Sequence, residues 1–533
     1  MYMYKPAYIA VTVVLLLLSG CVSPVEFTKY PSSQAESASE TAVEFPDYVY
    51  DPESAGYYVG NYAAVREDGY YLVINRVLHF FDIRQDILFP LCTKVSCLHK
   101  DQTCDGYIYD FSKSTGYNGW SSNACDNRIY YDGGNLYTVG VHSDKGRVLF
   151  RYDKDYHERE EIVWLEDYKN APFIRCIQDS ILFHSGYVYY VTWLYQEDKV
   201  SEREYETEFT AWRCRLDQKT EPEKLFSFEC MTTAELRGVR TCAFNGGIYY
   251  FIEHEKHYRI PDEELKEGDL PYQVTGASAR IYRYDEKDGQ EELIWSYAGD
   301  RTVSLFEAEG AIPSNRVFTT PLTCGDSLVN EEGDYIYFAG YPERYEQGLM
   351  PTSISMVNLE SREGKVLYQT PYMWIEQLRT DGKYYYFKEC GKKHTYVTAI
   401  DREGNLIRRY EMPLDEAFIE SERKREQSLR EMLAQAKTEE ERAGIQEALE
   451  RLLTEEGDPG SLRLLVTDGR YITLGSYGGS PVYKNLSSRV PGFSRSRLSF
   501  EVDDGIGVID TEAFISGKDV EIRQIYERME VFN

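Results

Sequence analysis

Cysteine and histidine side chains gather in one short segment, and these residue types can bind metal or form disulfides. Cys92, Cys97, His99 and Cys104 follow one another closely, and Cys125 comes further along the chain. Thiolate and imidazole are donors that zinc favours, so three thiols and one imidazole could form a tetrahedral Cys3His site. The segment therefore allows a zinc site, although no cofactor is required by any other motif.

Disulfides are the competing explanation for the same segment. The chain has eleven cysteines, and the ten that follow Cys21 are an even number. In an oxidising compartment an even number of cysteines favours pairing. Paired cysteines would staple a long loop that lacks its own core, with His99 only a neighbour. Free thiols are the third alternative, because buried reduced cysteines are ordinary in strands.

Other catalytic motifs are absent or incomplete in the sequence. There is no Gly-x-Ser-x-Gly elbow, which argues against a serine hydrolase. His254 and His257 miss the i, i+4 histidine spacing of a zinc protease by one residue, in a segment predicted to be a loop. No phosphate-binding glycine loop is present either. Further predictions of fold and location therefore come from the segments on either side of the cysteine segment.

The N-terminal segment has the form of a bacterial lipoprotein signal. The apolar run from Ala7 to Leu18 is too short to span a bilayer as a helix, and the sequence Leu18-Ser-Gly-Cys21 follows it directly. We predict a signal peptide over residues 1–20 and diacylation, as by palmitate, of the Cys21 thiol. The mature protein would then be anchored by its lipid to the extracytoplasmic face of the bacterial cell membrane.

Composition indicates a tethered domain outside the lipid bilayer. Residues 21–47 are rich in Ser, Glu and Ala and predict a flexible tether. The formal net charge of −30 argues against nucleic acid and anionic phospholipid surfaces as partners. The membrane is therefore expected to be a partner only through the lipid anchor.

A repeated strand pattern fills residues 48–533, in a chain with 47 tyrosines. A turn ending in glycine precedes an aromatic strand seven times, and the glycines that mark these turns are Gly69, Gly134, Gly186, Gly247, Gly333, Gly382 and Gly469. A second strand that ends in an Asp or Asn turn follows in most units. Two turns of this kind around four antiparallel strands are typical of a propeller blade.

The sequence therefore predicts an all-β fold, a propeller of about seven four-stranded antiparallel blades. Two packed sandwiches would also supply the strands, but they do not explain seven repeats of one unit. In each Tyr-Tyr pair we expect one ring to pack between neighbouring sheets and the other to cover the solvent face. Core packing is thus the expected role of the tyrosines.

Insertions lengthen particular connections of the repeat. The long segments between second and third strands, or between blades, are Tyr195–Phe209, His254–Ala279, Tyr341–Thr352, Gly478–Arg495, Cys92–Trp120 and Leu414–Gly460. Such connections open on one face of a propeller, so we predict one loop-rich face. The segment 413–460 predicts a helical-hairpin insertion before the last blade, because its apolar residues recur at helical spacing. Packing within the propeller is its expected role, and a lid or partner helix is the alternative.

The loop-rich face gives two hypotheses of function. In the first, the protein is a binding or scaffold module for a peptide, glycan or protein, because aromatic rings offer contact area at low entropy cost. The candidate ligand-binding residues are Trp193, Tyr195, Tyr258, Tyr272, Tyr341, Tyr345 and Tyr477. In the second, the protein is a carbohydrate-active lyase or glycosidase, with Glu253, His254 and His257 over the central channel of the propeller.

Three motifs together resemble a group of uncharacterised lipoproteins from Gram-positive, gut-type bacteria. They are the lipobox ending at Cys21, the repeated Asp-Gly-x-Tyr-Tyr strand and the segment Leu91-Cys92-Thr-Lys-x-x-Cys97-x-His99-x-x-x-x-Cys104. The resemblance covers residues 1–25 and about 50–528, and its repeats are similar to TolB-like propellers. It implies a fold and a cellular address, but it supplies no catalytic residues.

Overall fold

The structure is a computed structural model, and the chain divides into the compact units Met1–Tyr48 and Val49–Asn533. All described residues belong to the second unit. They are residues 63–527 without 75–76, 95, 100–102, 111–127, 143–144, 154–158, 168, 172, 195–204, 233–237, 260–271, 300–326, 341–350, 362–363, 371–373, 392–393, 413–415, 437, 440–441, 447–448, 450–460, 478–502 and 519.

The first four sheets, numbered as blades in chain order, use the strands up to residue 299. Blade 1 consists of β1 (Ala63–Arg66), β2 (Gly69–Ile74), β3 (Val77–Asp82) and β4 (Ile87–Pro90). Blade 2 consists of β5 (Tyr109–Asp110), β6 (Ile129–Tyr131), β7 (Leu136–His142), β8 (Gly146–Tyr152) and β9 (Arg159–Trp164). Blade 3 consists of β10 (Ile174–His184), β11 (Tyr187–Leu194), β12 (Tyr205–Arg215) and β13 (Glu223–Thr232). Blade 4 consists of β14 (Gly238–Phe244), β15 (Gly247–Arg259), β16 (Tyr272–Asp285) and β17 (Glu291–Gly299).

The last three blades and two helices complete the described part of the chain. Blade 5 consists of β18 (Ser327–Val329), β19 (Asp334–Gly340), β20 (Pro351–Asn358) and β21 (Gly364–Gln369). Blade 6 consists of β22 (Trp374–Thr380), β23 (Tyr384–Gly391), β24 (His394–Asp401) and β25 (Leu406–Glu411). Blade 7 consists of β26 (Ser461–Thr467), β27 (Tyr471–Tyr477), β28 (Asp503–Asp510) and β29 (Arg523–Glu527). The helices are α2 (Glu416–Gln435) and α4 (Thr511–Ile515).

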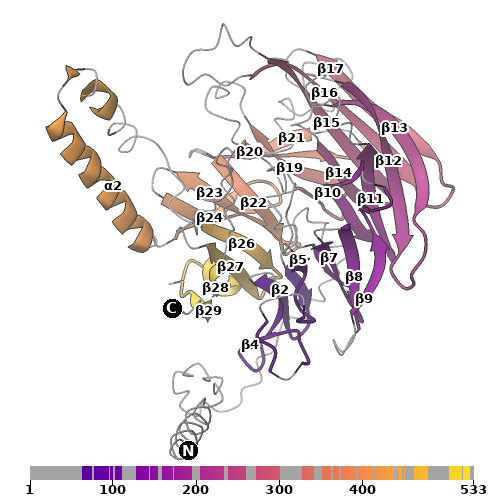
Figure 1. The fold of residues 1–533 in the computed structure, drawn as a ribbon, viewed down its shortest axis with the longest axis horizontal. Helices are drawn as coiled ribbons and strands as arrows, with labels where there is room; N and C mark the ends of the chain where they lie inside the picture. Colours follow the sequence, from indigo (N-terminus) through magenta and orange to yellow (C-terminus); the bar gives the residue numbers. More distant parts are fainter. Residues whose placement is uncertain are drawn as a thin grey trace, which may run out of the picture. The chain divides into compact units, whose positions relative to one another are not determined.

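These sheets confirm the predicted seven-bladed propeller of four-stranded antiparallel blades (Figure 1). Six sheets have four strands in simple chain order, and blade 2 has the short β5 as an additional strand parallel to β7. Each of the seven predicted glycine turns joins the first two strands of a blade. At Gly133 and Gly382, for example, φ is +90° and +83°, a conformation that glycine adopts without steric cost.

Seven clusters of buried side chains lie between the seven sheets, one at each junction of neighbouring blades. Tyr71 packs toward blade 2 in one cluster, whereas the adjacent Tyr70 packs toward blade 7 in another. In blade 6, Tyr385 packs toward blade 5 and the adjacent Tyr386 packs toward blade 7. The expectation that one ring of each pair covers the solvent face is therefore wrong. Both faces of a propeller blade are covered by neighbouring blades, so alternate side chains of a central strand are all buried.

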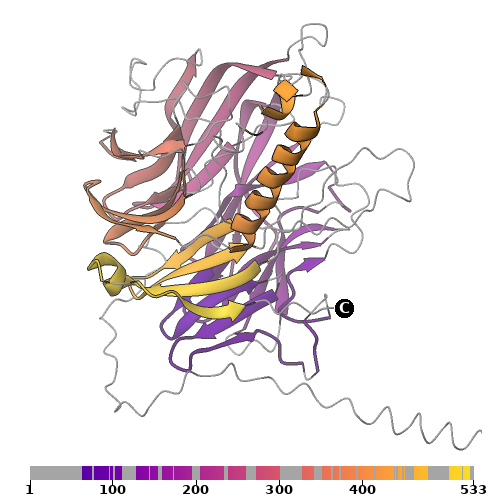
Figure 2. The same cartoon turned by 90° about the vertical axis from the view of Figure 1, so that its left-hand side faces the viewer.

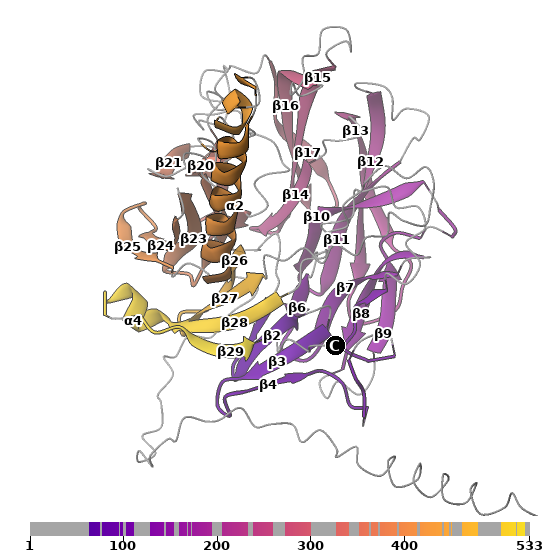
Figure 3. The ribbon, with the colours of Figure 1, turned by 60° about the vertical axis from the view of Figure 1, so that its left-hand side comes forward.

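The ring closes between blade 7 and blade 1 without exchanging a strand, since each blade in the described part of the chain uses consecutive strands. Figure 3 shows β27–β29 beside β2–β4. Tyr70 donates a hydrogen bond to Asp468 Oδ1 at 2.8 Å, and Arg470 donates to the backbone carbonyl oxygens of Arg66 and Glu67. Side chains and a shared core therefore hold this seam.

Strand order gives the propeller two different ends. The connections from first to second and from third to fourth strands, which include the seven predicted glycine turns, lie at one end, which we call the turn end. The other connections lie at the opposite end, the loop-rich end, and they include 91–128, 195–204, 260–271, 300–326, 341–350, 412–460 and 478–502. In blade 4 the strands β15 and β16 extend to residue 259 and from residue 272, so most of the predicted loop His254–Ala279 is a long hairpin.

One long helix occurs among the described residues, in the connection between blades 6 and 7 (Figure 2). This helix, α2, is highly charged, and its residues from Arg423 onward are exposed or half-buried. The half-buried positions Glu426, Leu429 and Leu433 lie on one helical face. Within the described part of the chain, no helix has the length and apolar character needed to cross a membrane.

Candidate metal centre

The first ligand of the candidate site is positioned by the end of blade 1. Strand β4 ends at Pro90, and the Leu91 N–H donates to the Leu78 carbonyl oxygen at 2.8 Å. The Cys92 N–H donates to the Pro90 carbonyl oxygen at 2.9 Å, which turns the chain sharply. Cys92 thus lies at the loop-rich end, directly where the chain leaves the blade.

The next two ligands come from a tightly curled loop. The Cys97 N–H donates to the Lys94 carbonyl oxygen at 3.3 Å, closing a turn. Ser96 and His99 have φ values of +67° and +52°, which are unusual for residues other than glycine. These two backbone angles curl the loop, so the side chains of Cys97 and His99 approach each other. Backbone strain of this kind is common at ligand-binding sites.

The last ligand, Cys104, begins the segment that joins blade 2. Its carbonyl oxygen accepts a hydrogen bond from the Tyr107 N–H at 3.1 Å, and its side chain is fully buried. The neighbouring residues Lys94 and Asp105 form an ion pair at 2.7 Å, and the Lys94 ammonium also donates to the Thr103 carbonyl oxygen at 2.6 Å. Lys94 therefore ties the two halves of the loop together.

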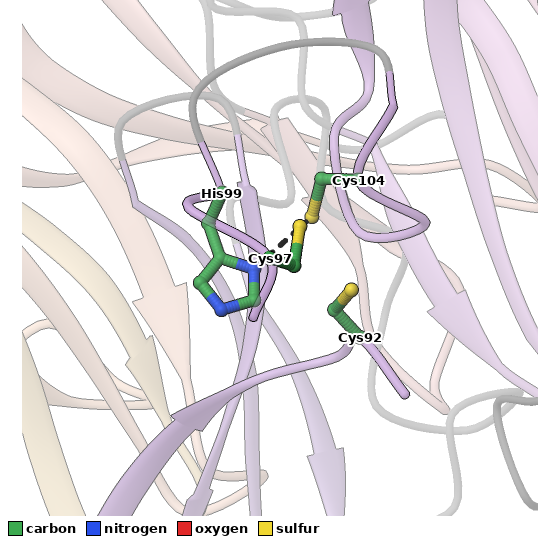
Figure 4. A group of neighbouring side chains, drawn as sticks. All are labelled: Cys92, Cys97, His99 and Cys104. Atoms are coloured by element: carbon green, nitrogen blue, oxygen red, sulfur yellow. Dashed lines mark hydrogen bonds between the residues drawn. The ribbon is translucent and has the colours of Figure 1, made fainter. Parts of the chain in front are cut away.

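The four side chains converge on one point, as Figure 4 shows. The ligand atoms of Cys92, Cys97, His99 and Cys104 all lie within 4.8 Å of one another, and His99 Nδ1 lies 3.3 Å from Cys104 Sγ. In a tetrahedral zinc site with Zn–S near 2.3 Å and Zn–N near 2.0 Å, S···S and S···N distances are about 3.8 Å and about 3.5 Å. The cluster can therefore hold a metal ion with little movement.

Burial and backbone hydrogen bonds act in opposite directions on the thiols of the cluster. Burial opposes ionisation of Cys92, but hydrogen bonds from the backbone N–H groups of Lys94 and Asp105 outweigh it and lower its pKa. Burial raises the pKa of Cys104 to about 12, although the Gly106 N–H also donates to its sulfur. Burial likewise lowers the pKa of His99, which favours the neutral imidazole that binds metal. A bound cation would deprotonate Cys104, since coordinated thiols lose their protons.

No disulfide joins the seven cysteines whose side chains the structure describes. Cys176, Cys214, Cys242 and Cys390 are buried in blades 3, 4 and 6, where they pack as small apolar side chains. Cys125 lies outside the described residues.

The structure places the aromatic candidates in different environments. Trp193 lies inside β11 and is 3% exposed, in the same core cluster as Phe209, because the strand continues one residue beyond it. Its ring is part of the junction between blades 3 and 4, so the expectation of a surface position does not hold. Tyr258, Tyr272 and Tyr477 are the last or first residues, or close to them, of β15, β16 and β27 at the loop-rich end. Tyr195, Tyr341 and Tyr345 lie outside the described residues.

The candidate acid and histidines of the enzyme hypothesis lie in a strand and not in a loop. Glu253, His254 and His257 belong to β15, where they are paired with Ala279, Ser278 and Val274 of β16. A register shift falls between Lys256 and His257. The positions are therefore part of a continuous hairpin, which alternates its residues between two faces.

A histidine, a serine and a glutamate meet at the turn end, and no motif in the sequence marks them. Ser185 Oγ lies 2.9 Å from His184 Nε2, and Glu286 Oε2 lies 3.2 Å from the same nitrogen. A hydrolytic triad needs the serine and the acid on opposite ring nitrogens. Tyr189 also donates to Glu286 at 2.6 Å, so the group is a link between blades 3 and 4.

Comparison with known proteins adds little beyond the fold. No protein-family model and no curated protein matches the chain. Among solved structures it is similar to an acylaminoacyl peptidase from Pyrococcus horikoshii, at 10% identity and a TM-score of 0.40, over 89% of this chain and 52% of the peptidase. The chain thus spans about half the length of that peptidase.

Two further solved structures also match the chain, with lower TM-scores. An oligogalacturonate lyase from Vibrio parahaemolyticus matches at 9% identity and a TM-score of 0.30, over 69% of this chain and 93% of the lyase. A putative TolB from Agrobacterium tumefaciens matches at 10% identity and a TM-score of 0.27, over 54% and 79% of the two chains. A peptidase, a lyase and a TolB are thus among the structural neighbours of the chain, while the blade count rests on its own sheets.

Proposed function

We propose that the protein is a binding or scaffold propeller anchored by a lipid on Cys21 at the extracytoplasmic face of the bacterial cell membrane. Its loop-rich end holds a peptide, glycan or protein partner. The lipobox supports the anchor, and the propeller fold supports a rigid platform for the binding surface.

The distribution of connections carries this proposal. The longest connections, residues 91–128, 300–326, 412–460 and 478–502, join strands at the loop-rich end. Most connections at the turn end are short, such as those at Asp132 and Asp381, whose side chains accept hydrogen bonds from the backbone, and the longest one there, residues 511–522, contains α4. Variation in length is tolerated at both ends of a blade. The concentration of the longest connections at one end therefore indicates that this end has a role beyond closing the fold.

Aromatic residues at this end supply the contact surface in the proposal. Tyr258, Tyr272 and Tyr477 lie at strand ends, and Tyr195 and Tyr345 lie in the connections. The net charge of −30 favours a basic or hydroxyl-rich ligand and disfavours nucleic acid. Trp193 has no part in this surface, because its ring is buried.

The same proposal assigns zinc to the cysteine and histidine cluster. Three thiolates and an imidazole suit zinc better than calcium or magnesium, which prefer oxygen ligands. Four protein ligands fill a tetrahedral shell and leave no position for water or substrate. Zinc there is therefore structural.

The binding proposal is tested with glycan and peptide arrays probed by the full-length chain in detergent. Alanine substitution of Tyr195, Tyr258 and Tyr345 together is expected to abolish capture of the array components that the parent chain binds. Substitution of Lys287 and Glu403, which are exposed at the turn end, is the matched control and is expected to change nothing. Equal capture by the two variants, or no capture by the parent chain, would refute the proposal.

A further inference from the structure

We propose that the zinc centre is a latch that holds the connection between blades 1 and 2 in place, an inference that rests on the zinc proposed above. The latch spans Cys92 to Cys104 and lies at the loop-rich end. When it is occupied, the connection is fixed against blade 1 and the first part of blade 2. When it is empty, that segment loses its structure while the other blades remain folded.

Both ends of the latch meet the same residue of strand β3. The Leu78 N–H donates to the Gly106 carbonyl oxygen at 2.8 Å, and the Leu78 carbonyl oxygen accepts from the Leu91 N–H at 2.8 Å. A Cβ atom on Gly106 would lie 2.8 Å from the Leu91 carbonyl oxygen, so the two segments approach too closely for any other residue. The chain leaves blade 1 and returns to it within one loop.

The segment after the latch is fastened to blade 2. The Arg159 guanidinium donates to the Tyr107 carbonyl oxygen at 2.7 Å, and the Tyr152 hydroxyl donates to the Asp105 carbonyl oxygen at 3.0 Å. Ile108 is buried in the cluster between blades 1 and 2, and β5 then pairs with β7. The latch therefore joins the two blades, and its place is set by contacts on both sides.

The loop between these fastenings has little apolar core of its own. Among its described residues, Leu98 is 75% exposed, and only the Cys104 side chain is buried. A segment that buries so little apolar surface does not offset the entropy of ordering its backbone. Metal binding supplies that free energy, because a preformed site is absent from the unfolded loop.

The charges around the cluster also suit a bound zinc ion. Zinc with three thiolates and a neutral imidazole has a net charge of −1. Lys94 lies between Cys92 and Cys97 in the loop, and its ammonium donates to an Asp105 carboxylate oxygen at 2.7 Å and to the Thr103 carbonyl oxygen at 2.6 Å. A lysine at this position compensates the remaining negative charge of the centre.

The test measures zinc, thiol reactivity and hydrogen exchange on the full-length chain in detergent. We expect one zinc ion per chain, which is lost in the variants Cys97→Ser and His99→Ala but kept in Cys242→Ala. Cys242 is the control because its thiol is buried in blade 4, away from the cluster. Chelation of the parent chain is expected to make Cys92, Cys97 and Cys104 reactive with an alkylating agent.

Hydrogen exchange then separates a latch from a zinc site without structural effect. Removing zinc is expected to speed exchange in peptides from residues 77–110 by at least tenfold and to leave blades 3–6 unchanged. A chain without zinc, or a peptide containing a Cys97–Cys104 disulfide, would overturn the proposal. Zinc whose removal leaves exchange over residues 77–110 unchanged would also overturn it. Array binding by the parent chain is measured separately, so failure of the latch and failure of the binding proposal are distinguishable.

Discussion

Removal of Arg470 is expected to weaken the closure of the propeller ring. Its guanidinium lies 2.5 Å from an Asp468 carboxylate oxygen and reaches the Arg66 carbonyl oxygen of blade 1 at 3.0 Å. The Asp468 side chain is only 1% exposed. The variant Arg470→Ala therefore leaves a buried carboxylate without its positive partner and also removes two contacts across the seam.

The size of the effect follows from the burial of the pair. Breaking a buried ion pair by removing one partner costs about 3–5 kcal/mol. The lower value applies here, because Asp468 keeps hydrogen bonds from the Tyr70 hydroxyl and from backbone N–H groups. At about 2.1 cal/mol/K per residue, the unfolding entropy of a domain of about 480 residues is about 1 kcal/mol/K. The melting temperature should therefore fall by about 3 °C.

Thermal unfolding followed by circular dichroism at one scan rate measures this shift. The matched control is Arg402→Ala, since Arg402 also bridges two blades but its partners Glu331 and Glu332 are exposed. Exposed ion pairs contribute less than about 1 kcal/mol, so the control should lose about 1 °C or less. If the two variants had the same melting temperature, Arg470 would not stabilise the contact between blades 7 and 1 more than an exposed ion pair does, and the reasoning would be refuted.

Three other outcomes follow from the structure. Trp193→Ala should lower the melting temperature by about 3–5 °C, as loss of a buried aromatic costs about 3–5 kcal/mol, while array binding per folded molecule stays unchanged. Gly106→Ala should reduce zinc content, whereas Gly134→Ala, whose Cβ would lie at an ordinary contact distance of 3.6 Å from Asp132 Oδ1, should match the parent chain in metal analysis. Burial works against ionisation of Glu286, but hydrogen bonds from His184 and Tyr189 outweigh it and lower its pKa below 4.5. The stabilisation is therefore present above pH 4.5 and lost as the pH falls further, and acid titration of Glu286→Gln should lack this component.

The repeat was readable from the sequence because its signals are local. A turn that needs a positive φ selects glycine, and the strand after it selects aromatic residues, so both signals lie within a few adjacent positions. The seven turns therefore predicted seven blades correctly. For the same reason the prediction that one ring of each tyrosine pair covers the solvent face was wrong. A single strand does not reveal whether one or both faces of its sheet are covered by other sheets.

Contacts between distant segments were not readable. Asp468 and Tyr70 are separated by most of the chain, and neither has a neighbour in sequence that signals the other. Trp193 was misplaced for a related reason, because the pattern did not show that β11 continues to Leu194. The residues of the candidate metal centre were found because all four ligands lie in one segment, although spacing alone did not separate metal from disulfides.

Connections at the two ends of the propeller are held in place in different ways. The candidate metal centre lies in a long connection that short-range hydrogen bonds alone do not fix. At the turn end, Asp132 and Asp381 accept backbone hydrogen bonds and also bind a tyrosine hydroxyl, so each turn is fixed by its own blade. At the loop-rich end, the longest connections span many more residues than a tight turn. The connection after Cys92 must also cross between two blades that no exchanged strand joins. A metal ion held by four side chains orders such a loop without an apolar core, and so leaves its outer surface available for a partner.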